Sequence, residues 1–306
     1  TLTGVNITVD WDNVGALVGH DDGGWTTIRN CHVTGSVDAV SHSNVGGIVG
    51  SSDQLDLVDV TVGEGTISGL DNVGGIVGSA TITTISGFAT TSYVVTNADV
   101  RGRGSIGGVV GSGTDVHLTR VTSTGNVEGS TKVGGLMGSI AVVGVGQNAT
   151  VESAKVTGNV STPASATTQE RIGGLIGFVD PMPPGYAGRV SVNESVAHGN
   201  ITFGNASIPA RLSGGLIGEV FTETPADAVS VTNSYSDGRI FGASGEYLGG
   251  LVGSVGVSND FSFNRVYSTS SVPLGTDVGG LFGDWGGFSL QGFWNPTAAS
   301  PTTVSA

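Results

Sequence analysis

The feature that most constrains this chain is a short glycine-rich motif that occurs nine times. Its fullest form reads Val45-Gly46-Gly47-Ile48-Val49-Gly50. Successive copies lie between 27 residues (Gly107 to Gly134) and 41 residues (Gly173 to Gly214) apart. The paired glycines that define the copies are Gly15, Gly46, Gly47, Gly74, Gly75, Gly107, Gly108, Gly134, Gly135, Gly173, Gly174, Gly214, Gly215, Gly249, Gly250, Gly279 and Gly280. A motif that recurs at this period indicates one small structural unit stacked on copies of itself.

A second landmark, Gly-x-Val/Ile, precedes most copies of the motif. Its first positions are Gly35, Gly65, Gly125, Gly158, Gly199 and Gly238, with Ala98 and Ser270 in two further repeats. Between the landmarks, segments such as 117–123 and 228–232 are β-branched and roughly alternate in polarity, which is typical of strands. The distance from this landmark to the paired glycines varies, because some repeats carry longer loops such as 161–169. Insertions that are confined to one place in a repeat are expected to lie on one face of a solenoid.

These patterns predict an all-β fold, a β-solenoid resembling a parallel β-helix, with nine repeats of about 33 residues. We expect a single domain over residues 1–306, with an N-terminal cap and first repeat at 1–30, repeats at 31–283, and a C-terminal cap and tail at 284–306. A solenoid core is open at both ends and needs covering. The tryptophans lie near the termini, so we expect Trp11 and Trp25 to cap one end and Phe288, Phe293 and Trp294 the other. A carbohydrate-stacking role is the alternative for these aromatic residues.

The motif has an unusual property if it forms one strand. Side chains alternate across a strand, so Val45, Gly47 and Val49 would face one way and Gly46, Ile48 and Gly50 the other. Both faces would then be apolar or bare, and both would need cover. Packing within the molecule and lateral contact between subunits are the two interpretations.

Composition narrows the classes of partner. The net charge of −14 excludes nucleic acid as an expected partner, because phosphate binding needs clustered Lys and Arg. An acidic surface with only two lysines suits a halophilic source, although ordinary acidic extracellular proteins share it. Cys31 is the single cysteine, so no internal disulfide forms, and we expect it to be a small core residue. No apolar run approaches the ~18 residues of a membrane span, and no signal peptide is found. The sequence begins at Thr1 without methionine, so we expect a mature or trimmed product.

Six N-x-Ser/Thr sequons are candidate glycosylation sites in a secreted protein. They are Asn6, Asn148, Asn159, Asn193, Asn200 and Asn205. In a chain rich in Ser, Thr and Asn, several would arise by chance.

The nine glycine units resemble the GLUG motif repeats, which occur in bacterial and archaeal surface adhesins and in the repeat region of IgA-specific metallopeptidases. The resemblance extends from Val14 to Gly283, with mild departures at Ala16 and Ser213. It implies an extracellular or cell-surface β-solenoid that serves as a scaffold without catalytic residues. The peptidase form is not supported, because the His-Glu-x-x-His zinc signature is missing.

The sequence contains only weak candidates for a cofactor site, a metal site or a catalytic site. Residues 102–107 fit G-x-G-x-x-G, but a strand is expected to follow, where a dinucleotide site needs a helix. Bound calcium is conceivable around Asp10, Asp12, Asp21 and Asp22, although no known calcium motif is present. We therefore predict neither a cofactor nor a metal site. For an enzyme, the acidic candidates are Asp56, Asp59, Glu152, Glu194 and Asp237, which form no convincing cluster. The threonine ladders of an ice-binding face are not evident, since runs such as 81–84 do not recur.

Taken together, the sequence predicts a non-catalytic extracellular protein of structural or adhesive function, on the cell surface or as a subunit of an extracellular filament. The filament hypothesis draws on the doubly apolar motif and on residues 1–9, an extended segment that could pair with a neighbour's edge. Its expected partners are copies of itself or cell-surface glycans. The alternatives are a β-helix that binds or cleaves polysaccharide and a viral fibre or spike.

Overall fold

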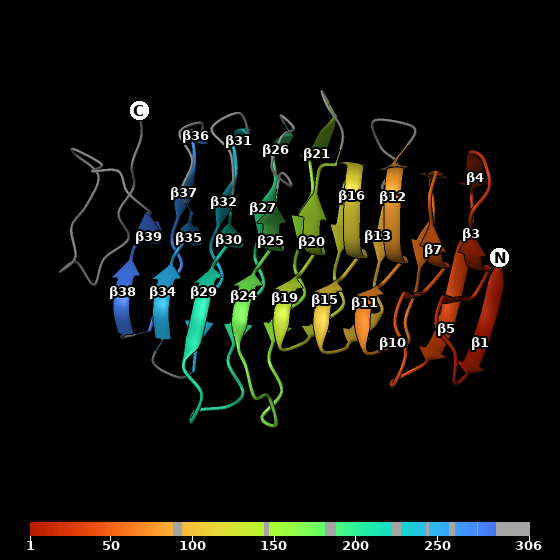
Figure 1. Cartoon of the computed structure of the whole chain (residues 1–306), viewed down its shortest axis with the longest axis horizontal. Helices are drawn as coiled ribbons and strands as arrows, with labels where there is room; N and C mark the ends of the chain where they lie inside the picture. Colours follow the sequence, from red (N-terminus) through yellow and green to blue (C-terminus); the bar gives the residue numbers. More distant parts are fainter. Residues whose placement is uncertain are drawn as a thin grey trace.

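The protein is all-β and consists of parallel sheets, as seen in a computed structural model (Figure 1). The structure describes residues 1–87, 94–143, 147–180, 188–221, 228–242, 245–256, 261–273 and 275–285, and within them no helix occurs. The repeats follow one another along the longest axis, from β1 at one end to β39 at the other (Figure 1). This confirms the all-β part of the predicted fold class, with repeats joined by parallel sheets.

Three sheets, here called A, B and C, contain the described strands. Sheet A contains β1 (Leu2–Thr8), β5 (His32–Asp38), β9 (Thr61–Val62), β10 (Thr66–Ser68), β13 (Val94–Thr96), β14 (Asp99–Arg101), β17 (Val121–Ser123), β18 (Val127–Glu128), β22 (Lys155–Val156), β23 (Val160–Ser161), β27 (Val196–Ala197), β28 (Ile201–Thr202), β32 (Tyr235–Ser236), β33 (Ile240–Phe241) and β37 (Tyr267–Ser268). Sheet B contains β2 (Val14–Gly15), β6 (Val45–Gly46), β11 (Asp71–Gly74), β15 (Gly104–Gly107), β19 (Thr131–Gly134), β24 (Glu170–Gly173), β29 (Ala210–Gly214), β34 (Gly245–Gly249) and β38 (Gly275–Gly279).

Sheet C contains the strands that follow the motif corner. They are β3 (Val18–Asp21), β4 (Thr26–Arg29), β7 (Val49–Ser52), β8 (Leu55–Val58), β12 (Val77–Ser86), β16 (Val110–Thr119), β20 (Met137–Ala141), β21 (Asn148–Glu152), β25 (Ile176–Asp180), β26 (Arg189–Asn193), β30 (Ile217–Val220), β31 (Ala228–Thr232), β35 (Val252–Val255), β36 (Phe261–Asn264) and β39 (Phe282–Trp285). The long strand β12 pairs with both β7 and β8 of one neighbouring repeat, and β16 pairs with both β20 and β21 of another. In these neighbouring repeats, two shorter strands take the place of one long strand.

The register joins each repeat to the next through equivalent residues. In sheet B, Val45 pairs with Val73, and Val73 pairs with Ile106. In sheet A, β5 pairs with both β9 and β10, so this sheet also continues as two ladders. Each repeat therefore hydrogen-bonds to its neighbours in all three sheets, and inward-facing aliphatic residues form one continuous core.

The motif is a corner rather than one straight strand. Val45 and Gly46 end their strand in sheet B, the chain bends at Gly47 and Ile48, and Val49 begins β7 in sheet C. Val45, Ile48 and Val49 are all fully buried, so the predicted alternation of two faces is wrong beyond the bend. A Cβ on Gly46 would lie 2.7 Å from the Ile76 oxygen and 2.8 Å from the Gly78 nitrogen, so the next repeat covers this position from within the molecule.

The second glycine of the motif lets sheet A approach the corner. A Cβ on Gly108 would overlap the Ser123 hydroxyl and the backbone oxygen of Gly135. The equivalent inward positions of sheet A form a column, which consists of Val62, Thr96, Ser123, Val156, Ala197, Ser236 and Ser268. The landmark glycines meet backbone in the same way, since a Cβ on Gly125 would overlap the Ala98 oxygen. Both glycine columns are thus set by close contact between repeats.

Two columns of left-handed residues recur from repeat to repeat. One lies inside or directly before the strands of sheet B and consists of Asn13, Asn44, Asn72, Ser105, Lys132, Arg171, Leu212, Tyr247 and Asp277. The other joins sheet C to sheet A and consists of Asn30, Asp59, Arg120, Ser153, Glu194, Asn233 and Arg265. Non-glycine residues seldom adopt φ values of 50° to 60°, so their recurrence at equivalent positions shows that the fold imposes this geometry.

The N-terminal end corrects two predictions. Strand β1 pairs with β5 of its own chain, and Val5 and Ile7 pack against the core, so residues 1–9 do not extend away toward a neighbour. The Trp11 and Trp25 side chains are 76% and 61% exposed and do not cap the core, because β1 occupies one edge and these rings project outward. The predicted C-terminal cap residues Phe288, Phe293 and Trp294 lie outside the described residues. Cys31 is half-buried and packs against the core.

Candidate functional site

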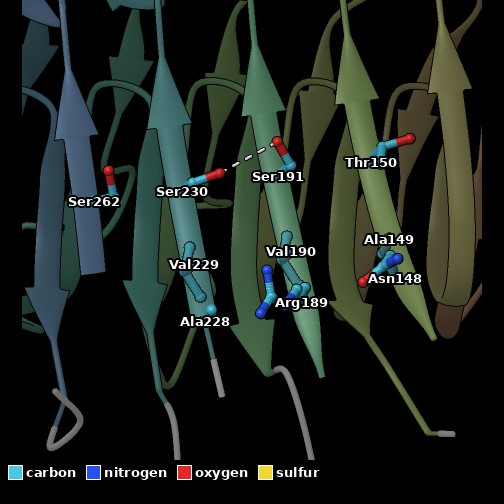
Figure 2. A pocket seen from close by; sticks show the side chains of 10 residues that line it. All are labelled: Asn148, Ala149, Thr150, Arg189, Val190, Ser191, Ala228, Val229, Ser230 and Ser262. Carbon is cyan, nitrogen blue, oxygen red and sulfur yellow. Dashed lines mark hydrogen bonds between the residues drawn. The ribbon is translucent and has the colours of Figure 1, made fainter. Parts of the chain in front are cut away.

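A hollow of about 430 Å³ lies on the outer face of sheet C (Figure 2). Four neighbouring strands, β21, β26, β31 and β36, form it. Its lining residues are Asn148, Ala149, Thr150, Arg189, Val190, Ser191, Ala228, Val229, Ser230 and Ser262. The local sequence explains this surface, since alternation turns the 1% exposed Val190 and Val229 toward the core and leaves the intervening polar residues outside.

One row of hydroxyl groups crosses the hollow. Thr150 pairs in register with Ser191, Ser191 with Ser230, and Ser230 with Ser262. The Ser230 hydroxyl donates to the Ser191 hydroxyl over 3.2 Å (Figure 2). His117 continues the row, with its Nδ1 3.0 Å from the Thr150 hydroxyl. Parallel strands space these groups about 4.8 Å apart.

A second polar row runs beside the first, two residues further along each strand. It consists of Glu152, Asn193, Thr232 and Asn264. The Asn193 Oδ1 accepts hydrogen bonds from the Thr232 hydroxyl at 2.8 Å and from Asn233 Nδ2 at 2.9 Å. The two rows, about 6.8 Å apart along the strand, present donors and acceptors in a regular array.

Among the described residues that line the hollow, only Arg189 has a charged side chain. It is exposed, and it pairs in register with Asn148 on one side and Ala228 on the other. Figure 2 shows Arg189 and Asn148 at the opposite end of the hollow from the hydroxyl row. A guanidinium beside hydroxyl and amide groups can donate several hydrogen bonds to a polyhydroxylated or anionic ligand.

The acidic residues considered for catalysis have separate settings. Asp56 lies on β8 and forms an ion pair with Arg29 at 3.2 Å, while Asp237 follows β32 and lies 2.8 Å from His198 Nδ1. Glu152 belongs to the second polar row. Asp59 and Glu194 occupy left-handed turns, and Glu194 accepts a hydrogen bond from Ser153 at 3.3 Å. The structure does not assemble them into one carboxylate site.

The four aspartates considered for calcium divide into two settings. Asp10 lies 2.6 Å from His42 Nε2, and Asp12 accepts a hydrogen bond from the Ser43 amide at 2.8 Å. The hydrogen bond to Asp10 and the charges of both carboxylates raise the pKa of His42. Asp21 instead accepts a hydrogen bond from Ser52 at 3.0 Å.

Hydrogen bonds, led by one from Thr26, lower the pKa of Asp21 despite opposing desolvation. Asp22 is exposed. No group of three metal-ligating side chains is found in the part of the chain that the structure describes.

The six sequons occupy several environments. Asn6 lies exposed on β1, and Asn148 lies exposed in the hollow. The Oδ1 atoms of Asn159 and Asn200 accept hydrogen bonds from the backbone amides of Asn200 and Arg239, at 3.0 and 2.9 Å, in a ladder along sheet A. Asn193 and Asn205 are partly buried, and the Asn205 Nδ2 donates to the Ala166 oxygen at 2.8 Å.

The hydroxyl row was missed in the sequence because insertions vary the spacing between its members. Thr150, Ser191, Ser230 and Ser262 are separated by 41, 39 and 32 residues. A usable signal was nevertheless present, because each lies between two apolar residues, as in Val190-Ser191-Val192 and Phe261-Ser262-Phe263. Residues 102–107, which fit the dinucleotide-binding pattern G-x-G-x-x-G, lead into and form β15 (Gly104–Gly107). As predicted, a strand, β16, follows them.

No protein family, curated protein or solved structure matches this chain. The described residues contain no helix long and apolar enough to span a membrane.

Proposed function

We propose that the chain is a β-solenoid of nine coils, one per GLUG-type repeat, which acts as a non-catalytic structural and adhesive protein at the cell surface. The observation that supports this most is the register, which carries equivalent residues from repeat to repeat through all three sheets. Hydrogen-bonded coils that share one core form a stiff rod. Nine coils at about 4.8 Å each give a length on the order of 40 Å.

The surface chemistry supports an extracellular setting. The net charge of −14, with eleven basic residues, keeps such a rod soluble and separated from anionic polymers. Salt screens the repulsion between exposed carboxylates, so this surface suits a saline exterior and a halophilic source. We include glycosylation at the exposed Asn6 and Asn148 in this proposal.

A non-catalytic adhesive function can be tested directly. Beads coated with the protein should be retained by cells or by cell-wall polysaccharide in the presence of salt, and release should leave the polysaccharide length unchanged. A fall in polysaccharide length during incubation would contradict the non-catalytic assignment. Failure of coated beads to bind any surface better than beads coated with albumin would contradict adhesion.

A polysaccharide-binding role is the second candidate, and the hollow on sheet C favours it. Its hydroxyl row and Arg189, with the second polar row beside them, offer repeated hydrogen bonds to sugar hydroxyl groups. Ser191→Trp should fill the hollow and reduce glycan binding at least about tenfold. Thr202→Trp places the same ring on the exposed face of sheet A and serves as the control. Equal binding by both variants would exclude the hollow as the glycan site.

A further inference from the structure

The two polar rows of sheet C continue beyond the hollow. Counted from β4, the outward positions of the hydroxyl row are Thr27, Asp56, Thr84, His117, Thr150, Ser191, Ser230 and Ser262. Those of the second row are Arg29, Val58, Ser86, Thr119, Glu152, Asn193, Thr232 and Asn264. The strands follow one another along the longest axis of the molecule, so both rows run along that axis (Figure 1). The hollow is therefore one part of a longer polar surface.

This surface has no net charge, although the whole chain carries −14. Within the two rows and the described residues at the Arg189 end of the hollow, two guanidinium groups balance two carboxylates, with histidine counted as neutral. The charged residues are Arg29, Asp56, Glu152 and Arg189. Arg29 and Asp56 also pair with each other at 3.2 Å, where the rows begin on β4 and β8. A balanced surface on an acidic protein gives no electrostatic advantage to an anionic polymer, and an uncharged ligand needs none.

Beyond that ion pair, the same chemical groups recur on β12, β16, β21, β26, β31 and β36. Apart from His117 and Glu152, every position of the two rows on these strands holds a hydroxyl or amide group. A single sugar would find several equivalent places here, each with few contacts. A chain of sugars instead gains contacts from one strand to the next without losing those already made. The recurrence therefore favours a polymer over a small ligand.

The hydrogen bonds inside the rows leave both donors and acceptors for such a polymer. The Ser230 hydroxyl donates to the Ser191 hydroxyl over 3.2 Å, so Ser191 keeps its own hydrogen to donate and Ser230 keeps lone pairs to accept. The Asn193 Oδ1 accepts two hydrogen bonds, from Thr232 and Asn233, and this residue therefore presents its amide nitrogen as a donor. Sugar hydroxyl groups donate and accept equally well, whereas a simple ion would use only one kind of group.

The spacing of the rows agrees with an extended sugar chain. Equatorially linked pyranose sugars repeat at a distance close to the ~4.8 Å between neighbouring strands. We propose that this face of sheet C binds an uncharged, extended polysaccharide that lies along the long axis, with about one sugar residue over each strand. The hollow holds the sugars over β21, β26, β31 and β36, and β12 and β16 extend the site beyond it. The proposal rests on the polysaccharide-binding role proposed above and names the class of glycan for the same site.

Calorimetric titration of the full chain tests the length and the charge of the ligand. The probes are β-1,4-linked oligomers of glucose, mannose, xylose and N-acetylglucosamine, from two to six sugars long, and glucuronate oligomers serve as the charged comparison. For the sugar that binds best, affinity should rise about threefold with each added residue, which is the effect of one net hydrogen bond. Glucuronate oligomers of equal length should bind at least about tenfold more weakly.

Two results separate this inference from the role on which it rests. An affinity that stays level from two sugars to six, or tighter binding of glucuronate, would overturn the extended uncharged ligand but leave a glycan-binding role. Failure of every oligomer to bind would remove the glycan-binding role as well.

A substitution outside the hollow tests the extent of the site. Thr84→Val removes one hydroxyl group on β12 and should lower the affinity for six sugars about threefold. Its affinity for three sugars should be unchanged, because these fit over the strands of the hollow. Thr122→Val makes the same change on the outer face of sheet A and should bind both oligomers like the wild type. Equal six-sugar affinity of Thr84→Val and the wild type would overturn the extended site, and so would inhibition of ice growth by a protein that binds no oligomer, which would assign the rows to an ice lattice.

Discussion

At the residue scale, the structure explains the glycines by contacts rather than by flexibility. The second motif glycine meets a side chain of sheet A and the backbone of the next repeat, as Gly108 does with Ser123 and Gly135. The first repeat has Ala16 at this position, where the chain end leaves the residue half-buried. Sequence alone identified these glycines as structural, but it could not identify the left-handed positions, since Lys132 and Leu212 carry no signal for φ above zero.

Gly108→Ala should destabilise the protein by about 2 kcal/mol or more, because its Cβ overlaps backbone that belongs to two hydrogen-bonded repeats. Urea denaturation followed by circular dichroism measures the change. Gly24→Ala is the control, since nothing lies within 4 Å of its added Cβ, and it should stay within about 0.5 kcal/mol of the wild type. Similar losses for both substitutions would contradict the packing explanation.

The contact between His42 and the two aspartates predicts a pH dependence. The pKa of His42 is raised above its ordinary value of 6.5 in the folded protein, so its contribution to stability is complete below that value. The contribution is lost as the pH rises through the raised pKa. Thermal midpoints of the wild type and His42→Gln should therefore differ at pH 5.5 and converge at alkaline pH. A difference that grows with pH would contradict the assignment.

At the element scale, short strands are defined by the turns that separate them. Segment 228–232 was predicted as a strand and is β31, whereas segment 117–123 is divided between β16 and β17 by Arg120, with φ of 55°. The buried residues Leu118 and Val121 lie three residues apart, so the alternation of polarity shifts by one residue at that turn. The polar rows of sheet C were hidden in the sequence because only the paired register brings Ser191 beside Ser230.

Leu212, inside β29, tests how strongly this position of sheet B selects its backbone conformation. Its φ is 51° and its side chain is half-exposed. Leu212→Gly removes the steric cost of the left-handed state and should leave stability unchanged or raise it by up to about 1 kcal/mol. Leu212→Val should lower stability by about 1 kcal/mol or more, because β-branching opposes this conformation. Denaturant titration of both variants checks the order, and a Val variant more stable than the Gly variant would contradict it.

At the scale of the whole molecule, the stabilising contacts connect each repeat mainly to the repeats directly before and after it. Each repeat takes its hydrogen bonds and core contacts from its neighbours, so an end differs from the middle only by what it lacks, as Leu17 of the first repeat shows with 47% exposure. The motif copies alone predicted the stacking of repeats. They could not predict that β1 would pair with β5, or that Trp11 and Trp25 would remain exposed, because both depend on what adjoins the terminal coil.

A stack held by neighbour contacts should tolerate the loss of one whole repeat. Deleting residues 107–133 joins Ile106 to Gly134, which replaces Gly107 at the equivalent register position. The shortened protein should fold cooperatively, and X-ray scattering should show a rod shorter by about 4.8 Å. Deleting residues 107–134 instead removes one residue more and turns the strand that follows to its opposite face. That variant should unfold at lower temperature than the in-register deletion, and equal stability of the two would contradict a fold determined by register.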